Sequence, residues 1–241
     1  MSKSVLITGA TRGLGAGLAR QFAARGYKLA LTGRKIEQLE ELKAEIESQA
    51  SQVCIRALDV ADTDTVATVL RECEQELGGL DIVIVNAGVA HVGKSTLEQV
   101  RQTFDVNLMG AVATSAAAIE IFRMQGRGQL VGISSVSAVR GLTGQGAYSA
   151  SKAGFSKYLE ALRCETHGEG ITITELVPGY IDTDLNRSLK SRPFVVSADK
   201  GTRIMADQIE RKVSFRYIPF WPWTLVAQIF KLLPISLLRK I

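Results

Sequence analysis

The sequence predicts an α/β fold, a doubly wound parallel sheet of about seven strands with helices on both faces, in a single domain over residues 1–241. Short, continuously apolar runs alternate along the chain with longer amphipathic runs, as expected for strands buried on both faces and for the helices that cover them. No linker or change of composition divides the chain. A length of 241 residues fits one domain with a sizeable core.

Each element follows from its own pattern. The predicted strands are 4–8, 28–32, 53–60, 81–85, 129–134 and 171–177. The predicted helices, which have helical period and charged outer faces, are 14–26, 36–48, 63–77, about 97–124 and 148–168. Gly26 and Gly168 stand where helix C-terminal caps belong. Such a sheet has right-handed crossovers and binds ligands at the carboxyl ends of its strands.

Composition excludes several classes of protein. The net charge of +5 is mild, and the basic residues are spread along the chain, which argues against a nucleic-acid partner. Cys54, Cys73 and Cys164 are scattered and have no metal-ligand spacing, so we expect neither a metal site nor a disulfide framework. Free cysteines point to a reducing compartment. The start "MSKSVLITGATRG" lacks a signal-peptide core, so the predicted location is cytoplasmic.

The first strand ends in a glycine-rich turn, "TGATRGLG", with Gly9, Gly13 and Gly15 in the spacing G-x-x-x-G-x-G. Glycines at these places permit a tight turn and a close approach of the backbone to a pyrophosphate. The amino end of the following helix supplies N–H donors and partial positive charge. The turn therefore predicts a dinucleotide site, although a glycine-rich turn without a ligand has the same composition.

The end of the second strand indicates which dinucleotide is bound. An acidic residue about twenty positions after the glycine turn would bind the ribose 2′-hydroxyl of NAD. Arg34 stands there instead, and Arg12 lies within the glycine turn. A guanidinium suits a phosphate, so the two arginines favour NADP (NADPH) over NAD. The alternative is that either arginine is merely solvated.

Several motifs in fixed order resemble the short-chain dehydrogenase/reductase family over about residues 3–185. They are "TGATRGLG", "LDV" with Asp59, "NAG" at 86–88, "FDVNLMG" with Asn107, "ISS", the pair Tyr148 and Lys152, and "PGYIDT" at 178–183. The resemblance implies a Rossmann-like fold and a catalytic group of Asn107, Ser135, Tyr148 and Lys152. The family serine lies close to 13 positions before the tyrosine, which selects Ser135, with Ser134 as its rival.

The resemblance and the chemistry together predict carbonyl reduction. Tyr148 donates a proton to the carbonyl oxygen as hydride arrives from the reduced nicotinamide. Lys152 lies one helical turn on, and its charge is expected to lower the phenol pKa. Ser135 would hold the carbonyl oxygen. The resemblance also implies that Lys152 holds the ribose hydroxyls, and that Asn107 interrupts a helix and holds a water.

The cofactor residues given by the motifs and the resemblance form one set. They are Gly9, Thr11, Arg12, Gly13, Leu14, Gly15, Arg34, Asp59, Val60, Asn86, Ala87, Gly88, Tyr148, Lys152, Pro178, Gly179, Ile181 and Thr183. Asp59 is expected near the adenine, or else serves as a strand-end cap. Asn86 has a structural role or contacts the cofactor, with equal weight given to each.

The predicted function is an NADPH-dependent reduction of a ketone or aldehyde to an alcohol, or the reverse. A non-catalytic NADP-binding sensor or scaffold is the alternative, and a sugar-nucleotide epimerase is disfavoured because the chain has no room for a second domain. Tyr180, Leu185 and Phe194, in the loop 178–200, are expected to form an apolar substrate wall. The resemblance implies a homodimer or homotetramer built on helices at about 98–124 and 148–167.

The tail at about 219–241 nearly has the composition of a membrane span, since Lys231 is the single charge between Phe220 and Leu238. Pro222 and Pro234 leave about eleven unbroken helical residues, too few to cross a bilayer. The predicted helix has an apolar and a polar side. The apolar side is Trp223, Val226, Phe230 and Leu233, and the polar side is Thr224, Gln228 and Lys231.

Two interpretations of this tail stay open. In one, the apolar side packs on its own domain or on a partner subunit. In the other, the tail makes weak contact with a membrane surface, with Trp221 and Trp223 at headgroup level and Arg239 and Lys240 near anionic lipid. The second would make the protein peripheral at a membrane and would suit a lipophilic carbonyl substrate.

Overall fold

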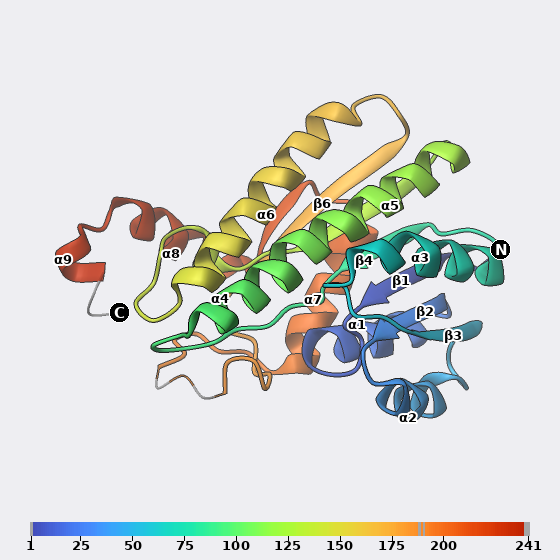
Figure 1. The fold of residues 1–241 in the computed structure, drawn as a ribbon, viewed down its shortest axis with the longest axis horizontal. Helices are drawn as coiled ribbons and strands as arrows, with labels where there is room; N and C mark the ends of the chain where they lie inside the picture. The colour runs from blue at the N-terminus through green and yellow to red at the C-terminus, as the bar shows by residue number, and fades with distance from the viewer. Residues whose placement is uncertain (1, 188, 190, 239–241) are drawn as a thin grey trace.

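A parallel sheet of seven strands forms the centre of the protein (Figure 1). The computed structural model describes residues 2–187, 189 and 191–238. The strands are β1 (Ser4–Thr8), β2 (Lys28–Gly33), β3 (Gln52–Ala57), β4 (Ile82–Val85), β5 (Gly128–Ile133), β6 (Ile171–Pro178) and β7 (Phe215–Ile218). Their order is β3-β2-β1-β4-β5-β6-β7, and every neighbouring pair is parallel. The predicted doubly wound sheet is confirmed.

Helices cover both faces of this sheet. They are α1 (Gly13–Ala23), α2 (Ile36–Ile46), α3 (Thr63–Leu77), α4 (Leu97–Phe104), α5 (Ala111–Gln125), α6 (Gly146–Glu165), α7 (Ala198–Glu210), α8 (Phe220–Leu232) and α9 (Ile235–Leu238). One core contains side chains of α1, α2 and α7, and the other those of α3, α5 and α6. Strand order reverses between β1 and β4, so a crevice for ligands is expected at their carboxyl ends.

The helix predicted over about 97–124 is interrupted in the middle. A π-helical segment, Asp105–Gly110, joins α4 to α5 and contains Asn107. Single π-helical turns of this kind are frequent at functional sites. The whole run 97–125 is long and apolar enough to span a membrane by length and composition, but 56% of its most apolar window is buried inside the protein. Its composition is therefore explained by packing, with Ile121 and Phe122 fully buried.

Two elements near the C-terminus were not located from the sequence. Helix α7 begins at Ala198 after the N-cap Ser197, whose hydroxyl accepts a hydrogen bond from the backbone N–H of Lys200, and it packs against α1. Strand β7 is the edge strand beside β6. Gly26 and Gly168, which the sequence predicts as C-terminal caps, have positive φ angles of 73° and 86° and lie three residues beyond the ends of α1 and α6, whose cap positions are Ala24 and Thr166.

Helix α8 rests on the domain through the apolar side that the sequence predicts. Trp223 and Ala227 are 1% exposed, and the Trp223 ring lies edge-on to Tyr180 at 5.6 Å between ring centroids. A side chain at Gly179 would collide with the indole, so the helix lies directly on this loop. The interpretation that this side packs on its own domain is confirmed. The helix ends at Leu232, before Pro234, and in Figure 1 α8 and α9 project from one end of the molecule.

Candidate active site

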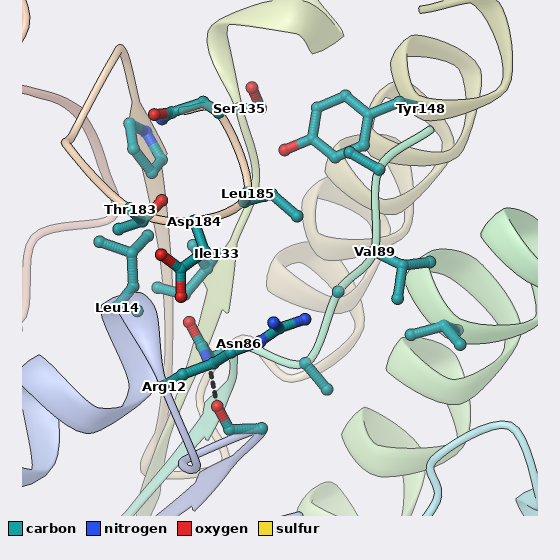
Figure 2. A pocket seen from close by; sticks show the side chains of 18 of the residues that line it. Arg12, Leu14, Asn86, Val89, Ile133, Ser135, Tyr148, Thr183, Asp184 and Leu185 are labelled. Carbon is teal, nitrogen blue, oxygen red and sulfur yellow. Dashed lines mark hydrogen bonds between the residues drawn. The ribbon is translucent and has the colours of Figure 1, made fainter. Parts of the chain in front are cut away.

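A cavity of about 650 Å³ lies at the carboxyl ends of the central strands. Its walls come from the turn after β1, the ends of β2, β4 and β5, the start of α6 and the loop after β6 (Figure 2). All the predicted catalytic and cofactor residues line it except Gly15 and Asn107. The strand topology has thus gathered motifs spread over residues 9–183 into one cavity.

The glycine turn forms the floor at the β1 end. Gly9 has a φ of +66°, which favours glycine. At Gly15 an added Cβ would lie 2.2 Å from the Gly9 carbonyl oxygen and 2.7 Å from Asn86 Nδ2. Gly15 therefore lets α1 pack against the turn from behind, and its absence from the cavity wall follows from this packing. Because glycines carry no side chain, the backbone N–H groups at the amino end of α1 are accessible and fit a pyrophosphate.

Asn86 braces this turn from the end of β4. Its amide Nδ2 donates to the carbonyl oxygens of Thr8 (2.9 Å) and Gly9 (3.1 Å). The Thr8 hydroxyl in turn accepts from the backbone N–H groups of Asn86 and Ala87. These bonds tie the ends of β1 and β4 together, and they support the structural role of Asn86. A contact between Asn86 and a cofactor stays a prediction.

Arg12 and Arg34 line the same end of the cavity. Ala10 N–H donates to the Thr32 carbonyl (2.9 Å), which holds the end of β2 beside the glycine turn. Arg34 Nη1 lies 4.0 Å from Asp59 Oδ2, and Asp59 Oδ1 accepts from the backbone N–H of Ala61. Asp59 thus caps its own turn and also faces an arginine. The guanidinium of Arg12 extends across the cavity (Figure 2), where the two cations suit a phosphate.

Ser135 and Tyr148 face each other at the other end of the cavity. In Figure 2 the Tyr148 hydroxyl points into the cavity, on the side of Ser135. Burial raises the pKa of Tyr148, and the Ser135 hydroxyl opposes this rise. Ser134 Oγ instead pairs with Ser156 Oγ on α6 at 2.7 Å. Of the two rival serines, Ser135 therefore has its hydroxyl beside the tyrosine.

Lys152 lies one turn after Tyr148 on α6 and is 5% exposed. Its Nζ donates to the carbonyl oxygen of Ile133 at 2.8 Å. Burial lowers the pKa of Lys152 to about 8. From the sequence we expect the charge of Lys152 to lower the pKa of Tyr148, but in this structure burial of the phenol is the larger effect and raises that pKa.

Asn107 stands behind the catalytic group rather than in the cavity wall. Its Oδ1 accepts from the backbone N–H of Val89 (2.8 Å), and its Nδ2 donates to the Val89 carbonyl (2.8 Å). Nδ2 also reaches the hydroxyl of Ser151, which donates to the carbonyl of Tyr148. Asn107 therefore links the segment after β4 to the helix that carries Tyr148, and its role in holding a water stays a prediction.

The loop after β6 supplies part of the expected apolar wall. Tyr180 and Leu185 line the cavity. Phe194 is 55% exposed and lies edge-on to Trp223 at 6.1 Å, so it supports the wall from outside. Leu189 and Val92 also line the cavity and were not expected from the sequence. Leu189 and Val92 belong to no sequence motif, so the sequence did not mark them as cavity residues. Val89 was also not expected at the site, because it contacts Asn107 through its backbone and any residue type could make that contact.

Comparison with known proteins agrees with the fold and the site. The short chain dehydrogenase family model matches residues 3–193, and the chain belongs to this family of oxidoreductases. An uncharacterized oxidoreductase of Mycobacterium tuberculosis (strain H37Rv) is 39% identical over 99% of this chain and 96% of its own length. Sulfoacetaldehyde reductase of Chromohalobacter salexigens is 34% identical over 76% of this chain and 74% of its own.

A solved structure shows the same architecture. The alcohol dehydrogenase of the archaeon Thermococcus sibiricus, complexed with 5-hydroxy-NADP, has a TM-score of 0.81 and 25% identity, and the match covers 90% of this chain and 95% of that one. The family and its fold imply a nicotinamide cofactor.

The buried ammonium of Lys152 makes stability depend on pH in a defined direction. Between about pH 8 and the ordinary lysine pKa of about 10.4, the unfolded chain binds more protons than the folded one, so this group's contribution to stability rises with pH. We expect Lys152→Met to raise the free energy of unfolding at pH 7 by about 1–3 kcal/mol, with the gain shrinking above pH 8.

Urea unfolding of both proteins at pH 7 and at pH 9.5 checks this. Lys157→Met, on the same helix with its side chain 79% exposed, is the matched control and should show no such dependence on pH. If Lys152→Met raises the free energy of unfolding by the same amount at both pH values, or lowers it at pH 7, then burial does not destabilise the Lys152 ammonium.

Proposed function

We propose that the protein is an NADPH-dependent oxidoreductase that reduces a ketone or aldehyde to an alcohol, and that the reaction is reversible. The observation that supports this best is that Tyr148 and Ser135 line the same cavity as Arg12 and Arg34, with the Arg12 guanidinium extended across it (Figure 2). The glycine turn and the two arginines fit the pyrophosphate and the 2′-phosphate of NADP. When bound, the cofactor supplies the hydride.

Each residue of the catalytic group has a proposed task. Tyr148 gives its phenolic proton to the carbonyl oxygen, and burial, which raises the pKa of Tyr148, keeps the phenol in its protonated form before that transfer. Ser135 donates a hydrogen bond to the same oxygen and fixes its position. Lys152 holds the ribose hydroxyls and, as a cation close by, favours the phenolate that proton donation leaves. Asn107 positions the helix of Tyr148 through Ser151.

The cofactor site is proposed over the predicted set of residues. Gly9, Thr11 to Leu14 and Gly88 surround the pyrophosphate and nicotinamide side. Asp59 and Val60 lie at the adenine, and Pro178, Gly179, Ile181 and Thr183 close the site from the loop after β6. All of these lie on the cavity wall. The lining of Tyr180, Leu185 and Leu189 suits a lipophilic carbonyl compound.

A non-catalytic NADP-binding sensor is the second candidate. The observation in its favour is that Lys152 Nζ is engaged by a backbone carbonyl. The complete catalytic group beside an apolar pocket argues against it, since a sensor has no need of a buried proton donor. A cytoplasmic location and a homodimer or homotetramer remain predictions.

Turnover tests the proposal directly. The purified protein is mixed with NADPH and a panel of aldehydes and ketones, and the loss of reduced cofactor is followed by absorbance. We expect Tyr148→Phe to lower kcat by about a hundredfold or more while the affinity for NADPH stays nearly unchanged, because the phenol acts on the carbonyl. An unmodified protein that binds NADPH but reduces no member of a broad panel would favour the sensor.

The two serines provide a paired test of the site geometry. Ser135→Ala should lower kcat/KM by about a hundredfold, because it removes a donor aimed at the carbonyl oxygen. Ser134→Ala removes the bond to Ser156 instead and should have a much smaller effect. The reverse order of the two effects would show that Ser134 is the residue that acts on substrate.

Cofactor preference depends on the paired arginines. Arg34→Asp should weaken NADPH binding by about ten- to a hundredfold, equal to about 1.5–3 kcal/mol for a charge-assisted hydrogen bond, and should change NADH binding far less. Titration of each cofactor with each protein measures this, and Lys43→Asp, the same reversal of charge on α2 away from the cavity wall, is the control. A preference of the unmodified protein for NADH would contradict the assignment.

A further inference from the structure

The outer side of α8 carries a second apolar stripe that the sequence analysis did not assign. Leu225, Ile229 and Leu232 follow one another at helical spacing and are 49%, 48% and 85% exposed, and Trp221, which precedes the regular part of the helix with non-helical backbone angles, is 69% exposed. Phe220, Ile235 and Leu237 extend the exposed apolar surface at the two ends of the helix. We call these seven residues the C-terminal apolar surface. Single soluble domains rarely leave a contiguous apolar surface of this kind uncovered unless it binds something.

The helix cannot turn this surface toward the domain, because its opposite side already packs there. Trp223 and Ala227 are buried against the domain, and Gly179 leaves no room between the loop and the indole. Arg140 fixes the far end by donating to the carbonyl oxygens of Phe230 and Lys231. The orientation of the exposed stripe is therefore set by contacts on the opposite side.

The C-terminal part of the chain carries charge of one sign. After Glu210 the chain contains no acidic residue, while it contains Arg211, Lys212, Arg216, Lys231, Arg239 and Lys240. Among the described residues, Lys231 is exposed on α8 and Arg216 lies over the Phe220 ring at 5.1 Å. Arg239 and Lys240, which the sequence analysis placed near lipid, lie outside the described residues. An apolar stripe bordered by cations and by an exposed tryptophan is complementary to an anionic bilayer surface.

Charge argues against a second copy of the chain as the occupant. A two-fold contact between copies would bring the same cations of both together, and residues 211–238 contain no acidic residue to pair with them. An interfacial helix needs only to lay one apolar side into the headgroup region.

We propose that α8 and α9 dock the protein on the surface of an anionic lipid bilayer, with the C-terminal apolar surface facing the acyl chains. Trp221 lies at headgroup level, and Lys231 and Arg216 lie near the lipid phosphates. Because Trp223, on the opposite side of α8, packs on the cavity residue Tyr180, docking places the substrate pocket about one helix diameter from the lipid. Binding to lipid needs no turnover, so this proposal stands apart from the proposed reaction.

Sedimentation with vesicles tests the proposal. The full chain is spun with vesicles of phosphatidylcholine, alone or with about a third of phosphatidylglycerol, since each cation at an anionic surface raises binding about fivefold. We expect the chain in the pellet with anionic vesicles and mostly in the supernatant with neutral ones. Trp221 should give a blue-shifted emission on binding, and this shift should be absent in Trp221→Phe.

Matched variants separate an effect of the C-terminal apolar surface from an effect of added negative charge. Leu225→Glu with Leu232→Glu places two carboxylates on the stripe and should lower vesicle binding by about a hundredfold, because burial of each leucine is lost. Leu97→Glu with Met124→Glu adds the same charge at apolar positions on α4 and α5 that are 65% and 61% exposed, and should bind nearly as the unmodified chain does. Thermal unfolding confirms that all the proteins are folded.

Three results would overturn the proposal. They are full-length protein that stays in the supernatant with anionic vesicles, equal sedimentation with neutral vesicles, and a stripe variant that still binds like the control. Light scattering after size exclusion identifies the competing occupant. If the stripe variant breaks an oligomer while the unmodified chain ignores vesicles, the surface is an interface between copies.

Discussion

The close approach between the turn after β1 and the start of α1 is the constraint on which the rest of the site depends. At Gly15 there is no space for a side chain, since the carbonyl oxygen of Gly9 and the amide of Asn86 lie where a Cβ would stand. Asn86 and Thr8 tie this turn to the end of β4. Strands β2 and β5 pair in parallel with β1 and β4, so the carboxyl ends of all four lie at the same edge of the sheet. The arginines and the catalytic residues that follow these ends therefore line one cavity.

Burial explains the electrostatics at the other end of the cavity. Lys152 is held by a single backbone carbonyl in an otherwise enclosed place, which lowers its pKa, while the same enclosure raises the pKa of Tyr148. Both shifts come from enclosure, so a molecule that enters the cavity and changes this enclosure would change the pKa values of Lys152 and Tyr148.

The sequence predicted most of the fold because buried parallel strands are continuously apolar and their helices are amphipathic. It did not locate α7, in which Gly201 interrupts the helical pattern, or β7, whose four residues include the partly exposed Phe215 and Arg216. Motif order placed nearly every predicted site residue on the cavity wall. It could not show that Gly15 packs behind the wall, that Trp223 supports Tyr180, or that α8 has two apolar sides, because each depends on how distant segments pack.

A crystal structure of the complex with NADP⁺ would show directly whether the cavity holds NADP with its nicotinamide against Tyr148. We expect the 2′-phosphate within hydrogen-bond reach of Arg12 and Arg34, the pyrophosphate on the turn that contains Gly13, and the nicotinamide beside Tyr148 and Ser135. A nucleotide bound elsewhere, or in this cavity with its nicotinamide directed away from Tyr148, would contradict the proposed cofactor site.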